Sequence, residues 1–251
     1  MKYPQFDYYP QCCNSSGFQM AEYWSKHWES RTDYRRDLRT EPLWETIKDI
    51  ISNKGLVLEA GCGSGQWVVF FNGLGHYSIG VDFSVQPLMH AKKQNPALKL
   101  IACDLRSMPF RNDSFDYIYC NGAVEHDVEG PEAALREFCR VLKPSGKLMC
   151  SVPCLNVERL FSLWWIALRD WLKKRKFLRC IAGKKDPFEF YQYLFTPLEY
   201  RARLESCGFK VMAIRPYGFR KKGRLQKTIS YFADKNLEFY NPHMMMAICQ
   251  K

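Results

Sequence analysis

Short apolar runs alternate with polar, helix-forming stretches along the middle of the chain. Five such runs lie at residues 56–60, 77–81, 98–102, 115–120 and 147–152. A helix is expected to continue through 69–74 from the glycine-rich turn that follows the first run, and another at 131–142 precedes a turn at 143–146. Apolar runs of four to eight residues separated by helical segments predict a parallel sheet with crossover helices.

The pattern resumes near the C-terminus. Thr196 is placed to cap a helix at 197–206, with Pro197 in the favoured first position, and Cys207-Gly208 ends it. Two more apolar runs, 209–214 and 244–249, are expected to be the sixth and seventh strands. Near the other end, a helix is expected at 43–51.

The first strand runs into three glycines at alternate positions, Gly61, Gly63 and Gly65, with Glu59 two residues before the first. Glycine lets the chain turn sharply and brings backbone amides close to a ligand. The dinucleotide-binding pattern needs another glycine at position 66, which is Gln66 here. The turn therefore favours S-adenosylmethionine over a pyrophosphate-containing cofactor.

Later strand ends carry the polar groups that an adenosine needs. Asp82 lies 21 residues after Gly61 and can accept both ribose hydroxyl protons, with Phe83 next to it. Asp104 can accept from the adenine amine while Leu105 packs on the ring. The fourth strand ends in two further candidates, Asn121 and Gly122. The alternative is structural, because a glycine turn can simply join a strand to a helix and Asp82 can cap the next helix.

Five motifs occur in order: Glu59-Ala-Gly-Cys-Gly-Ser-Gly65, Val81-Asp-Phe-Ser84, Cys103-Asp-Leu105, Phe115-Asp-Tyr-Ile118 and Arg140-Val-Leu-Lys-Pro-Ser-Gly146. Over residues 50–155 the chain resembles the class I S-adenosylmethionine-dependent methyltransferases, most of all the ubiquinone and menaquinone biosynthesis subgroup. Ser145 stands where that family usually has glycine. The resemblance implies the cofactor, but it says little about the acceptor, because one scaffold serves quinols, sterols, sugars, lipids and RNA.

The fold implied is α/β: a Rossmann-like, seven-stranded, mostly parallel sheet with helices on both faces, an antiparallel last strand and a helical lid insertion. One methyltransferase domain is expected over 1–251, a length that a single core can stabilise. Its expected parts are an N-terminal helical cap at 1–53, a cofactor-binding core at 54–152, a lid at 153–196 and a C-terminal helix with strands at 197–251. The aromatic segment 23–28 is expected either to cover the cofactor or to pack on the helix at 43–51.

Positive charge is concentrated in the last hundred residues. Residues 153–251 carry 20 basic and 8 acidic side chains, whereas 1–53 and 54–152 are close to balanced. Two clusters account for the excess, at 169–185 and 215–227. Since this part of the implied fold lies nearest the acceptor, the charge favours an anionic partner.

An apolar stripe precedes the first cluster, on a predicted helix at 160–172 that includes Trp164 and Trp165. Aromatic residues beside lysines and arginines are typical of a helix at an anionic lipid surface. A lid whose lysines are solvated explains the pattern equally well. RNA binding is a third interpretation of this region. It is less favoured, because RNA phosphates offer no apolar surface for two adjacent tryptophans.

Cysteine and histidine patterns point away from metal. The 11 cysteines include no Cys-x-x-Cys pair, and most lie in or beside predicted strands and helices, so buried, reduced thiols are expected. The 5 histidines show no metal-binding spacing. Pro153-Cys154 is similar to the Pro-Cys nucleophile of cytosine-5 methyltransferases, although it follows the fifth strand instead of the fourth. The chain lacks a signal-peptide pattern or a run of about 18 apolar residues, which favours a cytoplasmic protein, peripheral at a membrane at most.

The expected chemistry is methyl transfer to a small-molecule or lipid-linked acceptor, at oxygen. His126, five residues after Asn121, is the best-placed base, although it can also serve only to order its loop. The Asn-Pro-Pro-Tyr motif of nucleobase amine methylases is absent, since residues 120–123 read Cys-Asn-Gly-Ala. An RNA methyltransferase and a non-catalytic cofactor-binding subunit remain as alternatives, and the oligomeric state is left open.

Overall fold

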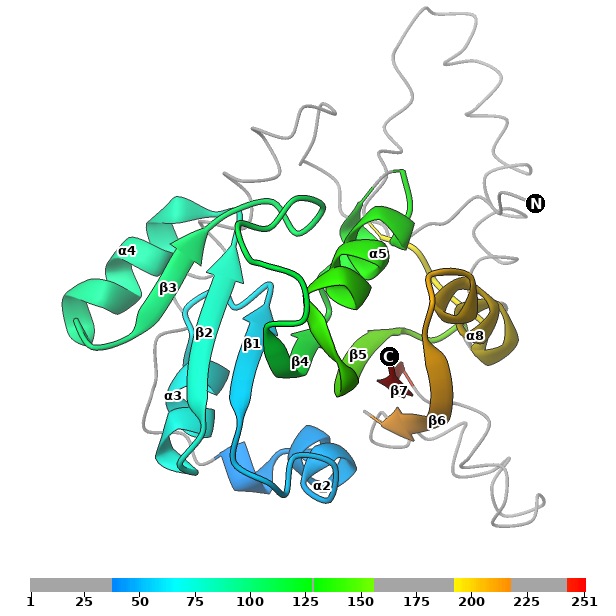
Figure 1. Cartoon of the computed structure of the whole chain (residues 1–251), viewed down its shortest axis with the longest axis horizontal. Coiled ribbons are helices and arrows are strands. Elements are labelled where there is room, and N and C mark those ends of the chain that lie inside the picture. Colours follow the sequence, from blue (N-terminus) through cyan, green and yellow to red (C-terminus); the bar gives the residue numbers. More distant parts are fainter. Residues whose placement is uncertain (1–37, 128, 156–191, 218–242) are drawn as a thin grey trace, which may run out of the picture.

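The computed structural model describes residues 38–127, 129–155, 192–217 and 243–251 (Figure 1). Several expected features lie outside the described residues: the aromatic segment 23–28, the lid helix 160–172, the first basic cluster, and all of the second cluster except Arg215.

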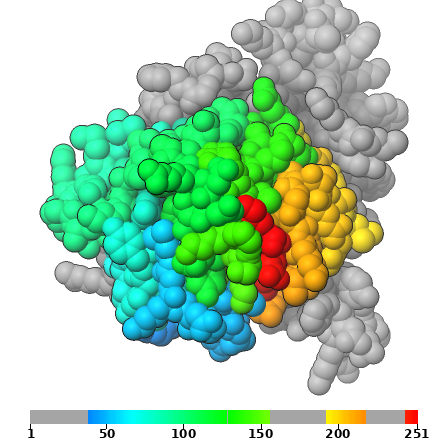
Figure 2. Space-filling view, viewed as in Figure 1, coloured from blue at the N-terminus to red at the C-terminus, as the bar shows by residue number. Residues whose placement is uncertain are grey.

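Within the described residues, seven strands form one sheet in the order β3-β2-β1-β4-β5-β7-β6. The first five strands in this order are parallel, and β7 runs antiparallel to both β5 and β6. The expected fold class is confirmed, including the reversed last strand. Figure 2 shows the last strand, in red, between the green surface of β5 and α5 and the orange surface of α8 and β6. The strands are β1 Leu56–Ala60, β2 Tyr77–Asp82, β3 Lys99–Ala102, β4 Phe115–Asn121, β5 Leu142–Pro153, β6 Lys210–Tyr217 and β7 Met244–Gln250.

Helices cover both faces of this sheet (Figure 1). The helix expected at 43–51 is shorter and ends at Ile47, where a turn follows in which the Ile50 N–H bonds to the Ile47 carbonyl at 2.9 Å. In the described part of the chain, no helix has the length and apolar character needed to cross a membrane. The helical elements are η1 Leu38–Thr40, α2 Pro42–Ile47, α3 Gln66–Gly73, α4 Val85–Gln94, η2 Val124–His126, α5 Glu132–Val141 and α8 Pro197–Ser206.

The sheet is buried on both sides, which explains why its strands read as continuous apolar runs. Alternate side chains point to opposite faces. Val57 and Tyr117 pack with α2 and α3, whereas Leu58 and Ile118 pack with α5 and α8. Burial of both faces fixes the strand register, and with it the positions of the strand ends.

β5 begins at Leu142, five residues before the expected start at Lys147. Phe115 pairs with Leu142 and Tyr117 pairs with Lys147, so residues 143–146 bulge out between the two pairs. Ser145 has a φ of 51°, within the left-handed region. The expected turn is therefore present as a bulge inside a longer strand.

The strand order reverses beside β1, because β2 lies on one side of it and β4 on the other. In open α/β sheets, ligands bind outside the carboxyl ends of the strands at this switch point. The glycine turn after β1 and the loops after β2 and β4 therefore meet at one edge.

α8 begins as its sequence predicts, because the Thr196 hydroxyl accepts a hydrogen bond from Glu199 N at 3.2 Å. We expect Thr196→Ala to lower the free energy of unfolding by about 1 kcal/mol, since a backbone N–H loses its partner. Urea unfolding of the whole chain measures this change. Leu198, on the same helix and 80% exposed, provides the control, and Leu198→Ala should change stability by less than about 0.5 kcal/mol. Equal effects of the two substitutions would contradict the capping role.

Candidate functional site

The turn after β1 depends on glycine at position 61. Gly61 and Cys62 donate their N–H groups to the Val81 carbonyl at 2.8 and 2.9 Å, which draws the turn against the end of β2. Gly61 has a φ of 75°, and a Cβ there would lie 2.5 Å from the Ala123 Cβ. A side chain at position 61 would therefore clash with the loop after β4, so backbone atoms alone form this edge of the site.

Glu59 holds the turn from within β1. Its side chain is buried, and Oε2 accepts a hydrogen bond from Val68 N at 2.7 Å, in the first turn of α3. Gly65, the N-cap of α3, has no side chain to cap the helix, so Glu59 supplies a cap from the preceding strand. Burial raises the pKa of the Glu59 carboxyl well above its usual value.

Asp82 connects the glycine turn to the end of β2. Oδ2 accepts from Gly63 N and Oδ1 from Ser84 N, both at 2.8 Å. Burial raises the pKa of the Asp82 carboxyl, and these hydrogen bonds oppose the increase. The Ser84 side chain and the Phe83 N–H also hydrogen-bond to this carboxylate, so a ligand hydroxyl would share its oxygens with them. Phe83, the next residue, is 43% exposed, so its ring is accessible to a ligand.

Asp104 and Leu105, the residues expected to contact adenine, already have partners within the protein. Both Asp104 oxygens accept from the Arg106 guanidinium at 2.7–3.1 Å, and these bonds lower the pKa of the Asp104 carboxyl. Leu105 packs against the main core. An adenine amine would have to compete with Arg106 for the Asp104 carboxylate. In the sequence, the only sign of this ion pair is that Arg106 lies two residues after Asp104.

The end of β4 carries a polar group that the sequence reasoning only partly identified. Asn121 Oδ1 accepts from the Ser151 hydroxyl at 2.7 Å and from the Tyr217 hydroxyl at 3.2 Å. Both partners come from strands far along the chain, β5 and β6, and no local pattern marks them. With its oxygen engaged, the Asn121 amide nitrogen is the part left to donate to a ligand. Gly122 follows with a φ of 69°.

η2 places Glu125 and His126 immediately after this strand end. His126, the expected base, is half-buried, and its Nε2 lies 3.8 Å from Glu125 Oε1. Glu125 is 1% exposed, and burial raises its carboxyl pKa to about 8. The sequence reasoning missed Glu125, because its neighbours Val124 and His126 give no signal that the acid points inward.

A pH-dependent effect on stability follows from the burial of Glu125. The folded protein keeps the carboxyl protonated up to about pH 8, whereas an unfolded chain releases that proton near pH 4.5. The stabilisation from protonated Glu125 is therefore complete below the lower value and is lost as the pH rises to the upper one. We expect Glu125→Gln to gain stability relative to the wild type across this window, by about 2 kcal/mol or more at the upper end.

Urea unfolding at several pH values measures the difference between Glu125→Gln and the wild type. Glu129→Gln, at an exposed position four residues further along, serves as the matched control and should show no such trend. A stability difference that does not change with pH would contradict the buried, protonated state of Glu125.

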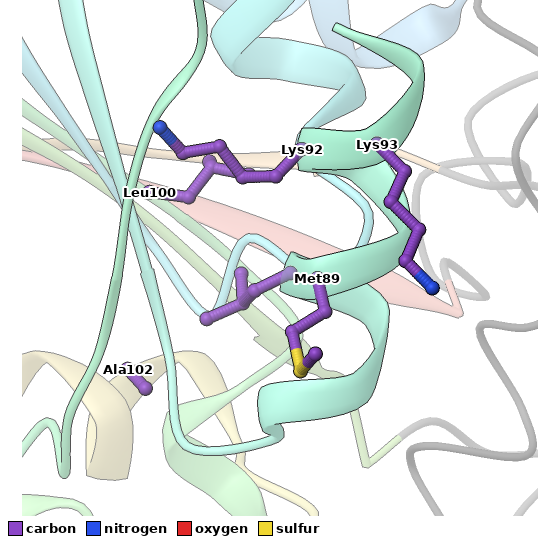
Figure 3. A pocket seen from close by; sticks show the side chains of 6 residues that line it. Met89, Lys92, Lys93, Leu100 and Ala102 are labelled. Atoms are coloured by element: carbon purple, nitrogen blue, oxygen red, sulfur yellow. The ribbon is translucent and has the colours of Figure 1, made fainter. Parts of the chain in front are cut away.

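A hollow of about 410 Å³ lies apart from these residues, between α4 and the edge strand β3. Leu88, Met89, Lys92 and Leu100 are among its lining residues. Lys92 extends from α4 over Leu100, while Lys93 points away from the strand (Figure 3). None of the expected site residues lines this hollow, so it belongs to the α4–β3 surface.

The eight described cysteines are all free, and six of them are buried. This agrees with the expectation of reduced thiols that fill the core. Cys154, at the end of β5, is only 4% exposed, and its N–H donates to the His243 carbonyl. A buried thiol of this kind does not resemble an accessible nucleophile.

The fold and site together define a class of protein. A sheet whose first strand ends in a glycine turn and whose second ends in a buried carboxylate is typical of α/β proteins that bind nucleosides or nucleotides. The antiparallel β7 between β5 and β6 narrows the class to the Rossmann-like methyltransferases. Residues 58–150 match the methyltransferase domain family. Over these residues the chain carries a methyltransferase domain similar to that of quinone methyltransferases, and the cofactor of this domain is S-adenosylmethionine.

Individual relatives agree with this assignment. The chain is 37% identical over 95 residues to a malonyl-[acyl-carrier protein] O-methyltransferase of Erwinia pyrifoliae, a match that covers 38% of this chain and only 36% of that enzyme. It is 29% identical over 191 residues to the demethylmenaquinone methyltransferase of Staphylococcus aureus, covering 68% of this chain and 75% of that one.

A solved structure shows the same fold. The 1,6-didemethyltoxoflavin-N1-methyltransferase of Burkholderia thailandensis, bound to its substrate and S-adenosylhomocysteine, superposes with a TM-score of 0.57 at 16% identity, covering 96% of this chain and 92% of that one. At this low identity the comparison supports the fold alone, and it leaves the acceptor to be argued separately.

The described residues fit the cofactor. The glycine turn is pressed against Ala123 so closely that backbone alone fits at position 61, and a buried carboxylate, Asp82, lies at the adjacent strand end. These are the two features that a bound nucleoside requires: close backbone approach and an acceptor for its ribose hydroxyls.

Proposed function

We propose that this chain is a methyltransferase that moves the methyl group of S-adenosylmethionine to an oxygen atom of a small-molecule or lipid-linked acceptor. The observation that carries this proposal is the Asp82 carboxylate, buried and hydrogen-bonded to Gly63 of the glycine turn. That contact places an acid and the backbone of Gly61 at neighbouring strand ends, which is the arrangement that holds an adenosine.

Each expected cofactor-binding residue has a role in this proposal. Asp82 accepts from the ribose hydroxyls, and Phe83 provides an apolar surface beside it. Glu59 keeps the turn in shape by capping α3, and Asn121 and Gly122 bound the site at β4. We assign Asp104 and Leu105 to the adenine end of the cofactor. The Asp104 carboxylate would then bind the adenine amine while it also bonds to Arg106.

The bound cofactor supplies a methyl group already activated by a positively charged sulfur, so no metal is needed to make it reactive. The chain must align the acceptor oxygen, exclude water and remove a proton. His126 lies on η2 at the end of β4 and is the residue first expected to take that proton.

The relatives and the charge of the chain support the proposed class of acceptor. The names of the relatives specify an acyl-carrier-linked acid and a quinone, which favours a small-molecule or lipid-linked acceptor here. The basic, aromatic region at 160–185 suits an anionic membrane surface, and we propose a cytoplasmic protein that contacts such a surface through its lid. We also propose that cap, core, lid and C-terminal parts form one domain.

Labelling experiments test the acceptor class. Radiolabelled S-adenosylmethionine and the protein are offered to separated small-molecule, lipid and RNA extracts, with Asp82→Asn as the inactive control. We expect label in the small-molecule or lipid fraction. Label in RNA alone would support the RNA methyltransferase alternative, and the basic clusters would then be the binding surface. Cofactor binding without labelling of any fraction would support a non-catalytic subunit.

A further inference from the structure

Glu125 occupies a fixed position just after the end of β4, which bounds the proposed cofactor site. It lies in η2, four residues after Asn121. Its carbonyl accepts from Tyr193 N at 2.8 Å, and the next residue, His126, donates its N–H to the Ala123 carbonyl at 3.2 Å. These bonds hold the backbone on both sides, so the direction of the Glu125 side chain is set by the fold.

The Glu125 carboxyl has an oxygen without a hydrogen bond. Oε2 is buried and has no partner within the described part of the chain. Oε1 lies against the backbone of Gly122, where a Cβ would sit 3.4 Å away, and 3.8 Å from His126 Nε2. An unsatisfied buried carboxyl is costly, and native proteins keep such groups mainly where they serve a function.

The other buried acids of this site differ from Glu125 in this respect. Glu59 accepts from Val68 N, and Asp82 accepts from both Gly63 and Ser84. Each of them therefore holds another part of the chain in place, whereas within the described residues the Glu125 carboxyl accepts a backbone hydrogen bond only from its own N–H, and Oε2 has no partner.

The groups around Glu125 leave its basicity high. The titratable neighbours are His126 and Asp127 on the same loop, Cys120 on β4 and Tyr217 on β6. Arg106 lies 3.7 Å from Asp127, and no arginine among the described residues contributes to the pKa shift of Glu125. Burial is the main reason that the carboxyl pKa is about 8, close to the value at which a general base works best near neutral pH.

We propose that Glu125 is the general base of the reaction, with His126 beside it as the route by which the proton leaves. This inference rests on the proposed function. The O–H bond of the acceptor breaks and its proton moves to the Glu125 carboxylate. An electron pair of the acceptor oxygen forms the new bond to the methyl carbon, while the bond from that carbon to sulfur breaks and its electrons leave with S-adenosylhomocysteine. Asn121, whose oxygen is occupied by Ser151 and Tyr217, donates from its amide nitrogen to hold that oxygen in place.

Two measurements on Glu125→Gln test the proposal, each with Glu129→Gln as the matched control. The first is the rate of methyl transfer from radiolabelled S-adenosylmethionine to the extract fraction that the wild type labels, as a function of pH. We expect the wild-type rate to rise with pH to a plateau above about pH 8. Glu125→Gln should be about 10²- to 10⁴-fold slower and lose this rise, and Glu129→Gln should follow the wild type.

The second measurement does not depend on turnover. Infrared difference spectra, recorded with S-adenosylhomocysteine bound, should show a protonated carboxyl in the wild type that ionises near pH 8 and is missing in Glu125→Gln. Calorimetry with S-adenosylhomocysteine should give the same affinity for both proteins, which shows that the variant is folded.

The outcomes separate this inference from the proposed function. A Glu125→Gln variant that binds the cofactor product and keeps the wild-type rate and pH profile would overturn the role of Glu125 alone. The same conclusion follows if the infrared signal of Glu125→Gln matches that of the wild type. A wild type that binds no S-adenosylmethionine would overturn the proposed function itself.

Discussion

Gly61→Ala is expected to weaken the binding of S-adenosylmethionine by at least about 100-fold. Two effects add: the residue has a φ of 75°, which costs a non-glycine residue about 1–3 kcal/mol, and its Cβ would lie 2.5 Å from the Ala123 Cβ. Relief of this clash must move the turn after β1 or the loop after β4. Calorimetry with S-adenosylmethionine measures the loss.

Two further variants show whether the clash is the cause. Gly73→Ala, in α3, places its Cβ where no atom lies within 4 Å, so affinity should be unchanged and stability slightly higher. In the double variant Gly61→Ala/Ala123→Gly, the opposing Cβ is gone and only the backbone strain remains. Part of the affinity should return. A double variant no better than Gly61→Ala would contradict the proposed contact between the two loops.

Asp82→Asn is expected to weaken cofactor binding by about 100-fold or more. The carboxylate accepts from two N–H groups, Gly63 N and Ser84 N, and an amide has only one oxygen for the two donors. Its NH₂ group must then face a backbone N–H, which leaves a buried donor unsatisfied at a cost of about 1–3 kcal/mol. The ribose hydroxyls lose their acceptor as well.

The control for Asp82→Asn is Asp49→Asn, the same substitution at an exposed position just after α2. Calorimetry should give wild-type affinity for Asp49→Asn, and urea unfolding should show Asp82→Asn still folded at the temperature of the titration. Wild-type affinity in a folded Asp82→Asn variant would contradict the assignment of Asp82 to the cofactor.

The sheet could be predicted from the sequence because its strands are buried on both faces. A strand such as Leu56–Ala60 must then be apolar throughout, and a helix must separate it from its parallel neighbour. The sequence also marks where β1 and β2 end, because Gly61 directly follows β1 and Asp82 is the last residue of β2. Strand boundaries are harder to predict where pairing with a neighbouring strand sets them. The start of β5 at Leu142, which the bulge at 143–146 separates from the rest of the strand, is an example.

The side-chain partners could not be predicted in the same way. Tyr217 bonds to Asn121 across 96 positions in the chain, because β7 brings β6 into the same sheet as β4. Arg106 takes both oxygens of Asp104, a choice that depends on the shape of one loop. Likewise, only the packed structure shows that Glu125 is buried, since an acid beside a histidine reads as a surface pair in the sequence.

Calorimetric titration of the wild-type chain with S-adenosylmethionine, and in parallel with a nicotinamide dinucleotide, shows which cofactor this strand-end site binds. We expect saturable binding of S-adenosylmethionine at one site, strongly weakened in Asp82→Asn, and no binding of the dinucleotide. Binding of the dinucleotide without any binding of S-adenosylmethionine would contradict this expectation.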